Sequence, residues 1–173
     1  MRASPPLVAL LRDGRRVVLR EVRAEDEAAF GAAFSRLSAD ARYNRFLGAV
    51  RELPPSVLER AVNPVEGSEV ALVAVCAEGE VADIVAGARY FVEGDGTSCE
   101  FAVTVAEDCR RTGLALHLMQ ALMAAARSRG VKSMRGYVLA SNAPMLGLAQ
   151  RLGFQTTASA DGPSVKLVSK SLV

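Results

Sequence analysis

Hydrophobic and polar positions along the chain follow two periods. Stretches rich in Val, Ala and Ile predict strands, and apolar residues spaced three and four apart predict amphipathic helices. The predicted strands are 16–22, 69–77, 81–92, 98–105, 133–139, 154–159 and 164–168. The predicted helices are 24–37, 38–49, 56–62, 112–130 and 141–152. The pattern contains no internal repeat.

Turn residues between the strands indicate how the strands pair. Glu78-Gly79-Glu80 and Glu93-Gly94-Asp95-Gly96 are hairpin signals, so strands 69–77, 81–92 and 98–105 are expected to form an antiparallel meander. The strand–helix–strand unit over 98–139 predicts a parallel pair. We therefore expect an α/β (α+β) fold, with a mixed, mostly antiparallel central sheet of about six to seven strands and helices on both faces.

Capping residues support the helix boundaries. Ser38 and Asn142 suit the N-cap position, because their side-chain oxygens can accept from the first free N–H groups of a helix. Gly130 and Gly153 suit the helix ends, since glycine readily adopts the left-handed conformation there. The apolar stripe of helix 112–130 consists of Ala115, Leu118, Met119, Leu122, Met123 and Ala126. This helix is therefore expected to pack against the sheet.

A length of 173 residues is typical of a single domain. Hydrophobic residues make up 50% of the chain, which is enough for a packed core. We expect one domain over 1–173, with a flexible or loosely ordered N-terminus at 1–13. The net charge of +2 is too small to indicate a nucleic-acid partner or a polybasic membrane anchor.

Cysteine usage and hydropathy indicate the cellular compartment in which the protein is expected. Cys76, Cys99 and Cys109 are odd in number and lack C-x-x-C spacing, so they predict neither a disulfide framework nor a metal site. The apolar run at 7–11 ends at Arg12 and is too short for a signal peptide or a membrane span. We expect a cytoplasmic protein, monomeric or homodimeric, with no membrane partner.

The stretch 103–115, V-T-V-A-E-D-C-R-R-T-G-L-A, carries the strongest functional signal. A strand leads into a polar turn with two arginines and a glycine, and a helix follows. Such a junction directs backbone N–H groups and the positive end of the helix dipole toward one point. We interpret it as a pyrophosphate-binding cradle; the alternative is an ordinary strand–helix junction with solvated arginines.

The six residues Arg110-Arg111-Thr112-Gly113-Leu114-Ala115 fit the pattern Arg/Gln-x-x-Gly-x-Gly/Ala. Together with Asn142 and Arg151-Leu152-Gly153-Phe154, they resemble the acyl-CoA site of the GNAT superfamily of N-acyltransferases, over roughly 11–168. The resemblance implies a GNAT-like fold and acetyl-CoA as co-substrate, without a metal. It also implies cofactor contacts by Val103, Val105, Arg110, Arg111, Thr112, Gly113, Leu114, Ala115 and Asn142. Among these, the Val105 N–H is the implied oxyanion partner.

A second set of motifs is similar to the acetyltransferase domain of bacterial protein-lysine acetyltransferases. The motifs are Leu11-Arg12-Asp13-Gly14, Arg20-x-x-Arg23-x-x-Asp26, Ser38-x-x-x-Arg42-Tyr43-x-Arg45-Phe46 and Glu100-Phe101-Ala102-Val103. That domain is often fused to a cyclic-nucleotide-binding or acyl-CoA-synthetase-like module, which this sequence lacks. The similarity implies an acceptor amine on a protein lysine and makes Glu100 the general base.

Several residues keep alternative interpretations. Glu100 could instead face solvent or pair with Arg89. Ala149 stands where many GNAT enzymes carry a tyrosine as general acid, so the thiolate is expected to leave unassisted, with Tyr137 and Tyr90 as weaker substitutes. His117 is expected on the helix surface, and Cys109 is a weak candidate nucleophile because no base lies nearby in the sequence.

The sequence is compatible with more than one acceptor. Tyr43 and Phe46 are expected to pack inward, whereas Arg42 and Arg45 could border the acceptor site or bind an acidic protein surface. A small-molecule amine, such as a polyamine or aminoglycoside, is the alternative acceptor. A non-catalytic acyl-CoA-binding module is the alternative to an enzyme.

Overall fold

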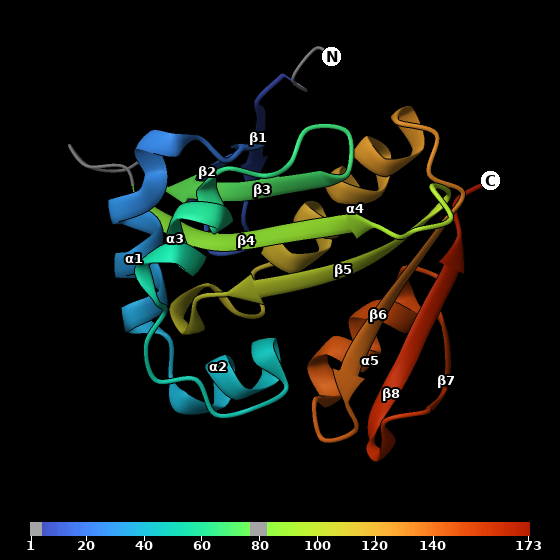
Figure 1. Ribbon diagram of the computed structural model, residues 1–173. Helices are drawn as coiled ribbons and strands as arrows, with labels where there is room; N and C mark the ends of the chain where they lie inside the picture. The colour runs from blue at the N-terminus through green and yellow to red at the C-terminus, as the bar shows by residue number, and fades with distance from the viewer. Residues whose placement is uncertain (1–4, 77–82) are drawn as a thin grey trace.

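The protein, described here from a computed structural model over residues 5–76 and 83–173, contains one eight-stranded sheet (Figure 1). The strand order is β1-β2-β3-β4-β5-β6-β8-β7. The strands are β1 (Leu7–Leu10), β2 (Arg16–Glu21), β3 (Glu69–Cys76), β4 (Asp83–Val92), β5 (Ser98–Val105), β6 (Ser133–Leu139), β7 (Gln155–Ser159) and β8 (Gly162–Ser171). The helices are α1 (Glu27–Arg36), α2 (Ala39–Phe46), α3 (Pro55–Val62), α4 (Leu114–Ser128) and α5 (Ala143–Arg151), with 3-10 turns η1 (Ala24–Asp26) and η2 (Glu107–Cys109).

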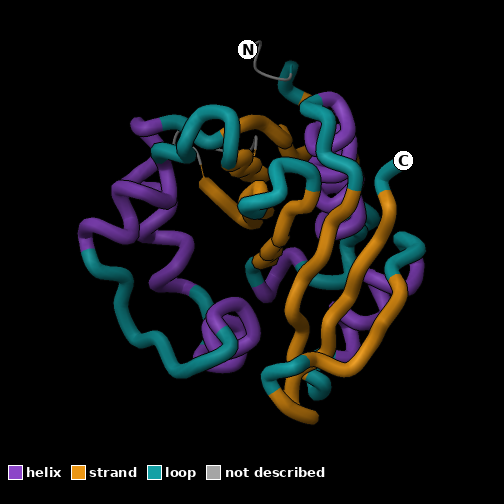
Figure 2. Tube along the Cα trace, turned by 45° about the vertical axis from the view of Figure 1, so that its right-hand side comes forward, coloured by secondary structure: helices purple, strands orange, loops and turns teal. Residues whose placement is uncertain are grey.

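Helices cover the sheet on both faces, as the sequence predicts (Figures 1 and 2). The larger core packs α4 and α5 against one face, with Leu118, Met119 and Leu122 fully buried. A smaller core on the other face joins Val62 of α3 and half-buried residues of α1 to β3. The apolar stripe predicted for α4 is therefore confirmed as its buried side.

The predicted helix starts are confirmed by side-chain caps. The Ser38 hydroxyl accepts from the N–H of Ala41 at 3.1 Å, and α2 begins at the next residue. The Asn142 side chain accepts from the N–H of Met145 at 3.3 Å, and Pro144 occupies the first turn of α5. The turn signal at 78–80 lies outside the described residues.

The expectation of a loosely ordered segment at 1–13 is wrong for 7–10, which forms β1. Leu7, Val8, Ala9 and Leu10 pair antiparallel with β2, and this strand makes the sheet one larger than the seven predicted strands. Ala9 is 4% exposed and Leu11 is 2% exposed, so both belong to the core. The sequence pattern misses this strand because it is only four residues long and is specified by its partner rather than by local signals.

The predicted parallel pair of β5 and β6 is confirmed, but it is short. Its register extends only over Ser98↔Ser133, Cys99↔Met134 and Glu100↔Arg135. The meander β3–β4–β5 is paired over its full length, and β6 instead pairs with β8 along Ser133–Leu139. The two halves of the sheet therefore separate beyond Glu100.

A side chain from β5 occupies the space behind this separation. Phe101 is 6% exposed and makes an edge-to-face contact with Phe154, with ring centroids 5.4 Å apart. A Cβ on Gly136 of β6 would lie 2.6 Å from a ring carbon of Phe101. Glycine at 136 is therefore required for the close approach of Phe101 to β6.

Replacing Gly136 with alanine tests this packing. We expect Gly136→Ala to lower the free energy of unfolding by about 1–3 kcal/mol, because the new methyl group overpacks the Phe101 site. Urea denaturation measures the change. Gly147→Ala is the control, since a Cβ there meets nothing within 4 Å. Combining Gly136→Ala with Phe101→Leu should recover part of the loss; equal stability of the two single glycine variants would refute the packing role.

Candidate active site

The opening between β5 and β6 contains a cavity of about 580 Å³. It lies between the last residues of β5, the start of α4 and the start of α5. Eight of the ten predicted site residues line it: Val103, Val105, Arg110, Arg111, Gly113, Leu114, Ala115 and Asn142. The tertiary structure thus brings the β5 residues, the cradle and the α5 cap to one place.

Thr112 is the cofactor-site residue that does not line this cavity. It is 6% exposed, and its hydroxyl donates to the carbonyl of Cys109 at 2.5 Å. Its carbonyl accepts from the N–H of Arg12 at 3.0 Å. Both contacts hold the loop in shape, so the Thr112 side chain stabilises the cradle rather than reaching a ligand.

The loop before α4 leaves a row of backbone N–H groups without acceptors. Gly113 is the N-cap, with φ +90°, and Arg111 has φ +60°. The first helical bond runs from His117 N–H to the Gly113 carbonyl at 3.2 Å. Among the described residues, nothing accepts from the N–H groups of 111–116. Such a row at a helix N-terminus matches the acceptor oxygens of a pyrophosphate.

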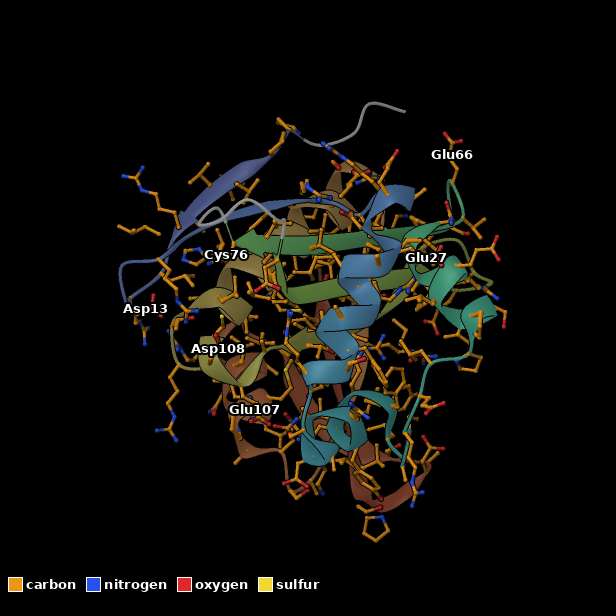
Figure 3. The ribbon with its side chains drawn as sticks, turned by 90° about the vertical axis from the view of Figure 1, so that its left-hand side faces the viewer. Asp13, Glu27, Glu66, Cys76, Glu107 and Asp108 are labelled. Atoms are coloured by element: carbon orange, nitrogen blue, oxygen red, sulfur yellow. The ribbon has the colours of Figure 1, made fainter. Side chains whose placement is uncertain are left out.

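Three further arginines line the cavity, Arg12, Arg45 and Arg151, and none of them is among the predicted site residues. Arg12 comes from the loop after β1, and Arg151 ends α5. The loop is held by Arg15, which bonds both to the Asp13 carboxylate and to Asp108 of η2. Asp13 and Asp108 lie at the same end of the molecule (Figure 3). The signal that could have found Arg12 is the Leu11-Arg12-Asp13-Gly14 motif.

The register of β5 shows which main-chain groups face the opening. Ala106 N–H donates to the Val85 carbonyl and Glu93 N–H to the Ser98 carbonyl, so even-numbered residues of β5 bond to β4. In an antiparallel pair, the odd-numbered residues then point to the other edge. On that edge β5 has no strand partner beyond Glu100. The N–H and C=O groups of Val103 and Val105 therefore face the opening and can pair with an extended ligand.

Glu100 is half-buried at the point where β5 and β6 part. Its neighbours Cys99 and Phe101 face α4, so the Glu100 side chain points to the opposite face, toward α1–α3. It forms no ion pair or hydrogen bond with the described residues. Arg89 pairs with Glu69 at 3.4 Å, and Arg135 pairs with Glu93. The structure therefore gives no support to a Glu100–Arg89 pair.

A second cavity, of about 620 Å³, lies on that opposite face between α1–α3 and the sheet. It meets the first cavity at three residues, Arg45, Ala102 and Thr104, which line both. Ala102 and Thr104 follow Glu100 on the same face of β5. The two cavities therefore adjoin where the strands separate, and we call the region between them the passage.

The four residues singled out on α2 have different environments. Phe46 packs edge-to-face on Phe34, with centroids 5.9 Å apart, as expected. Tyr43 is 47% exposed, so the expectation that it packs inward is wrong. Arg42 bonds to the carbonyls of Ser35 and Arg51 and holds α2 to its neighbours. Phe46 lines the second cavity, and Arg45 lines both cavities.

Other candidate residues are placed clearly. Cys109 is 1% exposed, and burial raises the pKa of its thiol, which disfavours a nucleophilic thiolate. His117 is half-buried on α4 and lines neither cavity. Tyr90 is 1% exposed within the core, so it is no candidate acid, whereas Tyr137 lines the first cavity. Ala149 is fully buried and contributes nothing to the site.

Comparisons with known proteins agree with this geometry. The Acetyltransferase (GNAT) family matches residues 32–154. The Acetyltransferase PA5475 of Pseudomonas aeruginosa is 36% identical over 148 residues, which is 85% of this chain and 79% of that protein. An L-methionine sulfoximine/L-methionine sulfone acetyltransferase of the same species is 40% identical over 63 residues, 36% of this chain and 37% of that protein.

Solved structures share the fold. The GNAT domain of Streptomyces lividans PAT superposes with a TM-score of 0.88 at 22% identity, over 96% of each chain. A Salmonella typhimurium protein, yncA, whose structure includes its cofactor acetyl-CoA, superposes with a TM-score of 0.72 at 19% identity, over 91% of this chain and 94% of that one. A cAMP-binding acyltransferase from Mycobacterium smegmatis is 25% identical with a TM-score of 0.66, and this chain covers 48% of it.

The chain belongs to the GNAT acetyltransferase family. It is an acyl-CoA-dependent acetyltransferase, and the acetyl donor of the family is acetyl-CoA. In residues 5–76 and 83–173, no helix is long and apolar enough to cross a membrane. Over the same residues, no cluster of three or more His, Cys, Asp or Glu could hold a metal ion.

Replacing Gly113 with alanine tests the cradle. The left-handed φ at 113 disfavours any side chain, so Gly113→Ala should cost about 1–2 kcal/mol of stability and weaken CoA binding about tenfold or more. Isothermal titration measures the affinity. Gly67→Ala is the matched control, because Gly67 has φ +85° and nothing lies within 4 Å of its Cβ. Equal CoA affinities for the two variants would argue against the cradle.

Replacing Arg12 tests the contribution of the β1 loop. We expect Arg12→Gln to weaken CoA binding about threefold at low salt, and less at high salt, because an exposed charge is screened. Titrations at two ionic strengths measure both effects. Arg16→Gln, exposed at the start of β2, is the control. A loss that does not depend on salt would assign Arg12 a structural role instead.

Proposed function

We propose that this protein transfers an acetyl group from acetyl-CoA directly to a primary amine, with Glu100 as general base. The observation that carries the proposal is the passage between the two cavities. The first cavity has the unpaired N–H groups for a pyrophosphate, and the second opens on the same face as the Glu100 side chain. Donor and acceptor can therefore approach from opposite sides and meet near Ala102.

Different residues of the chain would bind different parts of acetyl-CoA. The N–H row at 111–116, with Arg110 and Arg111, would hold the pyrophosphate. The free edge of β5 would pair with the pantetheine arm through Val103 and Val105, and Asn142 would lie beside it at the start of α5. Bound acetyl-CoA supplies the electrophilic thioester carbon. The N–H of Val105, which faces the opening, would stabilise the oxyanion.

Glu100 would receive the proton of the acceptor through water. At about 3.3 Å per residue, Glu100 lies about 10 Å along the strand from Val103 and about 17 Å from Val105. A carboxylate at that separation does not reach the amine directly, so the proton would pass to it along a chain of ordered waters. The absence of an ion pair on Glu100 within the described parts of the chain leaves its carboxylate available to such a water.

The leaving thiolate would depart without a tyrosine at position 149. Ala149 is fully buried, and its methyl group has no proton to donate. A thiol with a pKa of about 8.5 is a tolerable leaving group. Tyr137 lines the first cavity and has a hydroxyl group that could supply a proton.

The side chain of a protein lysine is the proposed acceptor, in line with the sequence motifs shared with protein-lysine acetyltransferases. Its aliphatic stem suits the apolar walls of the second cavity, formed by Phe34, Leu37, Phe46 and their neighbours. The three free cysteines, Cys76, Cys99 and Cys109, support a cytoplasmic location.

A small-molecule amine is the second candidate, and the shape of the second cavity favours it. The cavity lies under α1, α2 and α3 rather than on a flat surface. One relative, over a limited stretch of sequence, acetylates L-methionine sulfoximine and L-methionine sulfone. Polyamines and aminoglycosides fit poorly, because the described lining contains three arginines and no acidic side chain.

Replacing Glu100 separates an enzyme from a non-catalytic acyl-CoA-binding module. We expect Glu100→Gln to lower kcat by about 10²–10⁴-fold while the affinity for acetyl-CoA stays the same, because the amide cannot accept the proton. Thiol release and calorimetry measure the two quantities. Glu27→Gln, exposed on α1, is the control (Figure 3). If the wild type binds acetyl-CoA but acetylates no amine, the enzymatic proposal fails.

A further inference from the structure

The second cavity combines apolar walls with positive charge. Among the residues that the structure describes, the helical side of the cavity contributes Phe30, Phe34, Leu37, Phe46, Leu53 and Val57. The sheet contributes small residues, among them Ala71, Ala86 and Ala102. The charged groups of the lining are Arg45, Arg60 and Arg89, with no carboxylate. A cavity of this kind suits an apolar molecule that carries a negative charge.

Arg45 lies where the two cavities meet and has no acidic partner. Among the described residues no carboxylate lies within ion-pair distance, and its guanidinium packs over the Phe46 ring at 4.9 Å. Burial, together with the nearby charge of Arg89, lowers the pKa of Arg45 to about 10, and Glu100 partly opposes this. A half-buried cation with so little compensation is stabilised by an incoming anion.

Arg89 is the second cation near this junction, and its charge is only partly compensated. Its side chain is 14% exposed, and it shares the buried carboxylate of Glu69 with Arg60, at 3.4 and 3.3 Å respectively. Its Nε atom is buried without a hydrogen-bond partner. In the sheet Arg89 is directly opposite Ala102, so it lies beside the same junction as Arg45. The two guanidiniums together leave positive charge incompletely balanced next to the proposed reacting position.

We propose that Arg45 and Arg89 bind a carboxylate of the acceptor close to its reacting amine, while the apolar cavity holds the rest of the acceptor. The acceptor class is therefore an amine with a nearby carboxylate and an apolar body. Two sources share this chemistry: a free α-amino acid with an apolar side chain, and a protein lysine beside an acidic residue. The inference rests on the proposed function and names the substrate class of the same site.

The acyl group is the competing occupant, because a dicarboxylic acyl chain could also reach Arg45. The size of the cavity favours the acceptor. A volume of about 620 Å³ that extends to α1 and α3 is suited to a whole small molecule or peptide segment, whereas an acyl chain would enter only from Arg45. The two occupants can be separated by varying donor and acceptor independently.

The experiment compares acceptors with and without the carboxylate, at matched concentrations of the neutral amine. Leucine is paired with leucinamide, and a lysine peptide with flanking glutamates is paired with the same peptide carrying glutamines. Thiol release from acetyl-CoA gives kcat/KM for each. We expect the wild type to favour the carboxylate member of one pair by roughly tenfold or more, since hydrogen bonds to ionised groups are strong. The pair that is discriminated identifies the source.

Variants of Arg45 and Arg89 test whether these arginines cause the preference for the carboxylate acceptor. Arg45→Gln and Arg89→Gln should each reduce it to about threefold or less, whereas Arg45→Lys should retain part of it because the charge remains. Arg16→Gln, exposed on β2, should leave it unchanged. Equal rates within both pairs, or a preference that survives both glutamine variants, would overturn the proposal. If the arginine variants change the preference between succinyl-CoA and acetyl-CoA but leave the preference between acceptors unchanged, the proposal is also overturned.

A binding measurement keeps this result separate from the proposed chemistry. The same four acceptors are titrated into the wild type and Arg45→Gln in the presence of CoA, which cannot donate an acetyl group. Tighter binding of a carboxylate member, lost in Arg45→Gln, supports the inference even if no acceptor is turned over. Binding that does not depend on the carboxylate refutes it even if acetylation is observed.

Discussion

The loss of pairing between β5 and β6 beyond Glu100 is the feature on which the rest of the structure depends. A continuous sheet would satisfy the inner edge of β5 with a neighbouring strand, and no ligand could reach it. Here Phe101 packs against Gly136 and Phe154 where the pairing ends. Beyond that point the N–H and C=O groups of Val103 and Val105 remain without a strand partner. The separation therefore provides both the proposed donor site and the approach to it from the other face.

Charge is distributed differently on the two sides of this passage. On the donor side the positive groups lie around the start of α4, where backbone N–H groups and exposed arginines face the same cavity. On the proposed acceptor side the guanidiniums of Arg45 and Arg89 are partly buried and only partly compensated. Exposed charges mainly attract an anion, whereas buried charges select one, because desolvation strengthens their interaction with a partner.

Much of the fold could be predicted because its signals are local. The bounds of β5 and β6 match the predicted ranges, and Ser38 and Asn142 cap their helices as expected. The parallel pair followed from the strand–helix–strand order. In contrast, β1 is only four residues long, which is too short for a local pattern to identify it. Its position in the sheet depends on its pairing with β2. Arg12 reaches the cradle only because β1 and its loop fold back onto Thr112.

The sequence by itself determined where the candidate cradle lies, because two arginines, a glycine and a helix start are adjacent in the chain. It also determined which segments are strands and helices, because periodicity and caps act over a few residues. Only the tertiary structure decided which face Glu100 occupies, where the sheet opens, and that Arg45 rather than Arg42 faces the junction. These depend on strand register and on contacts between distant segments, whose free energies no local pattern encodes.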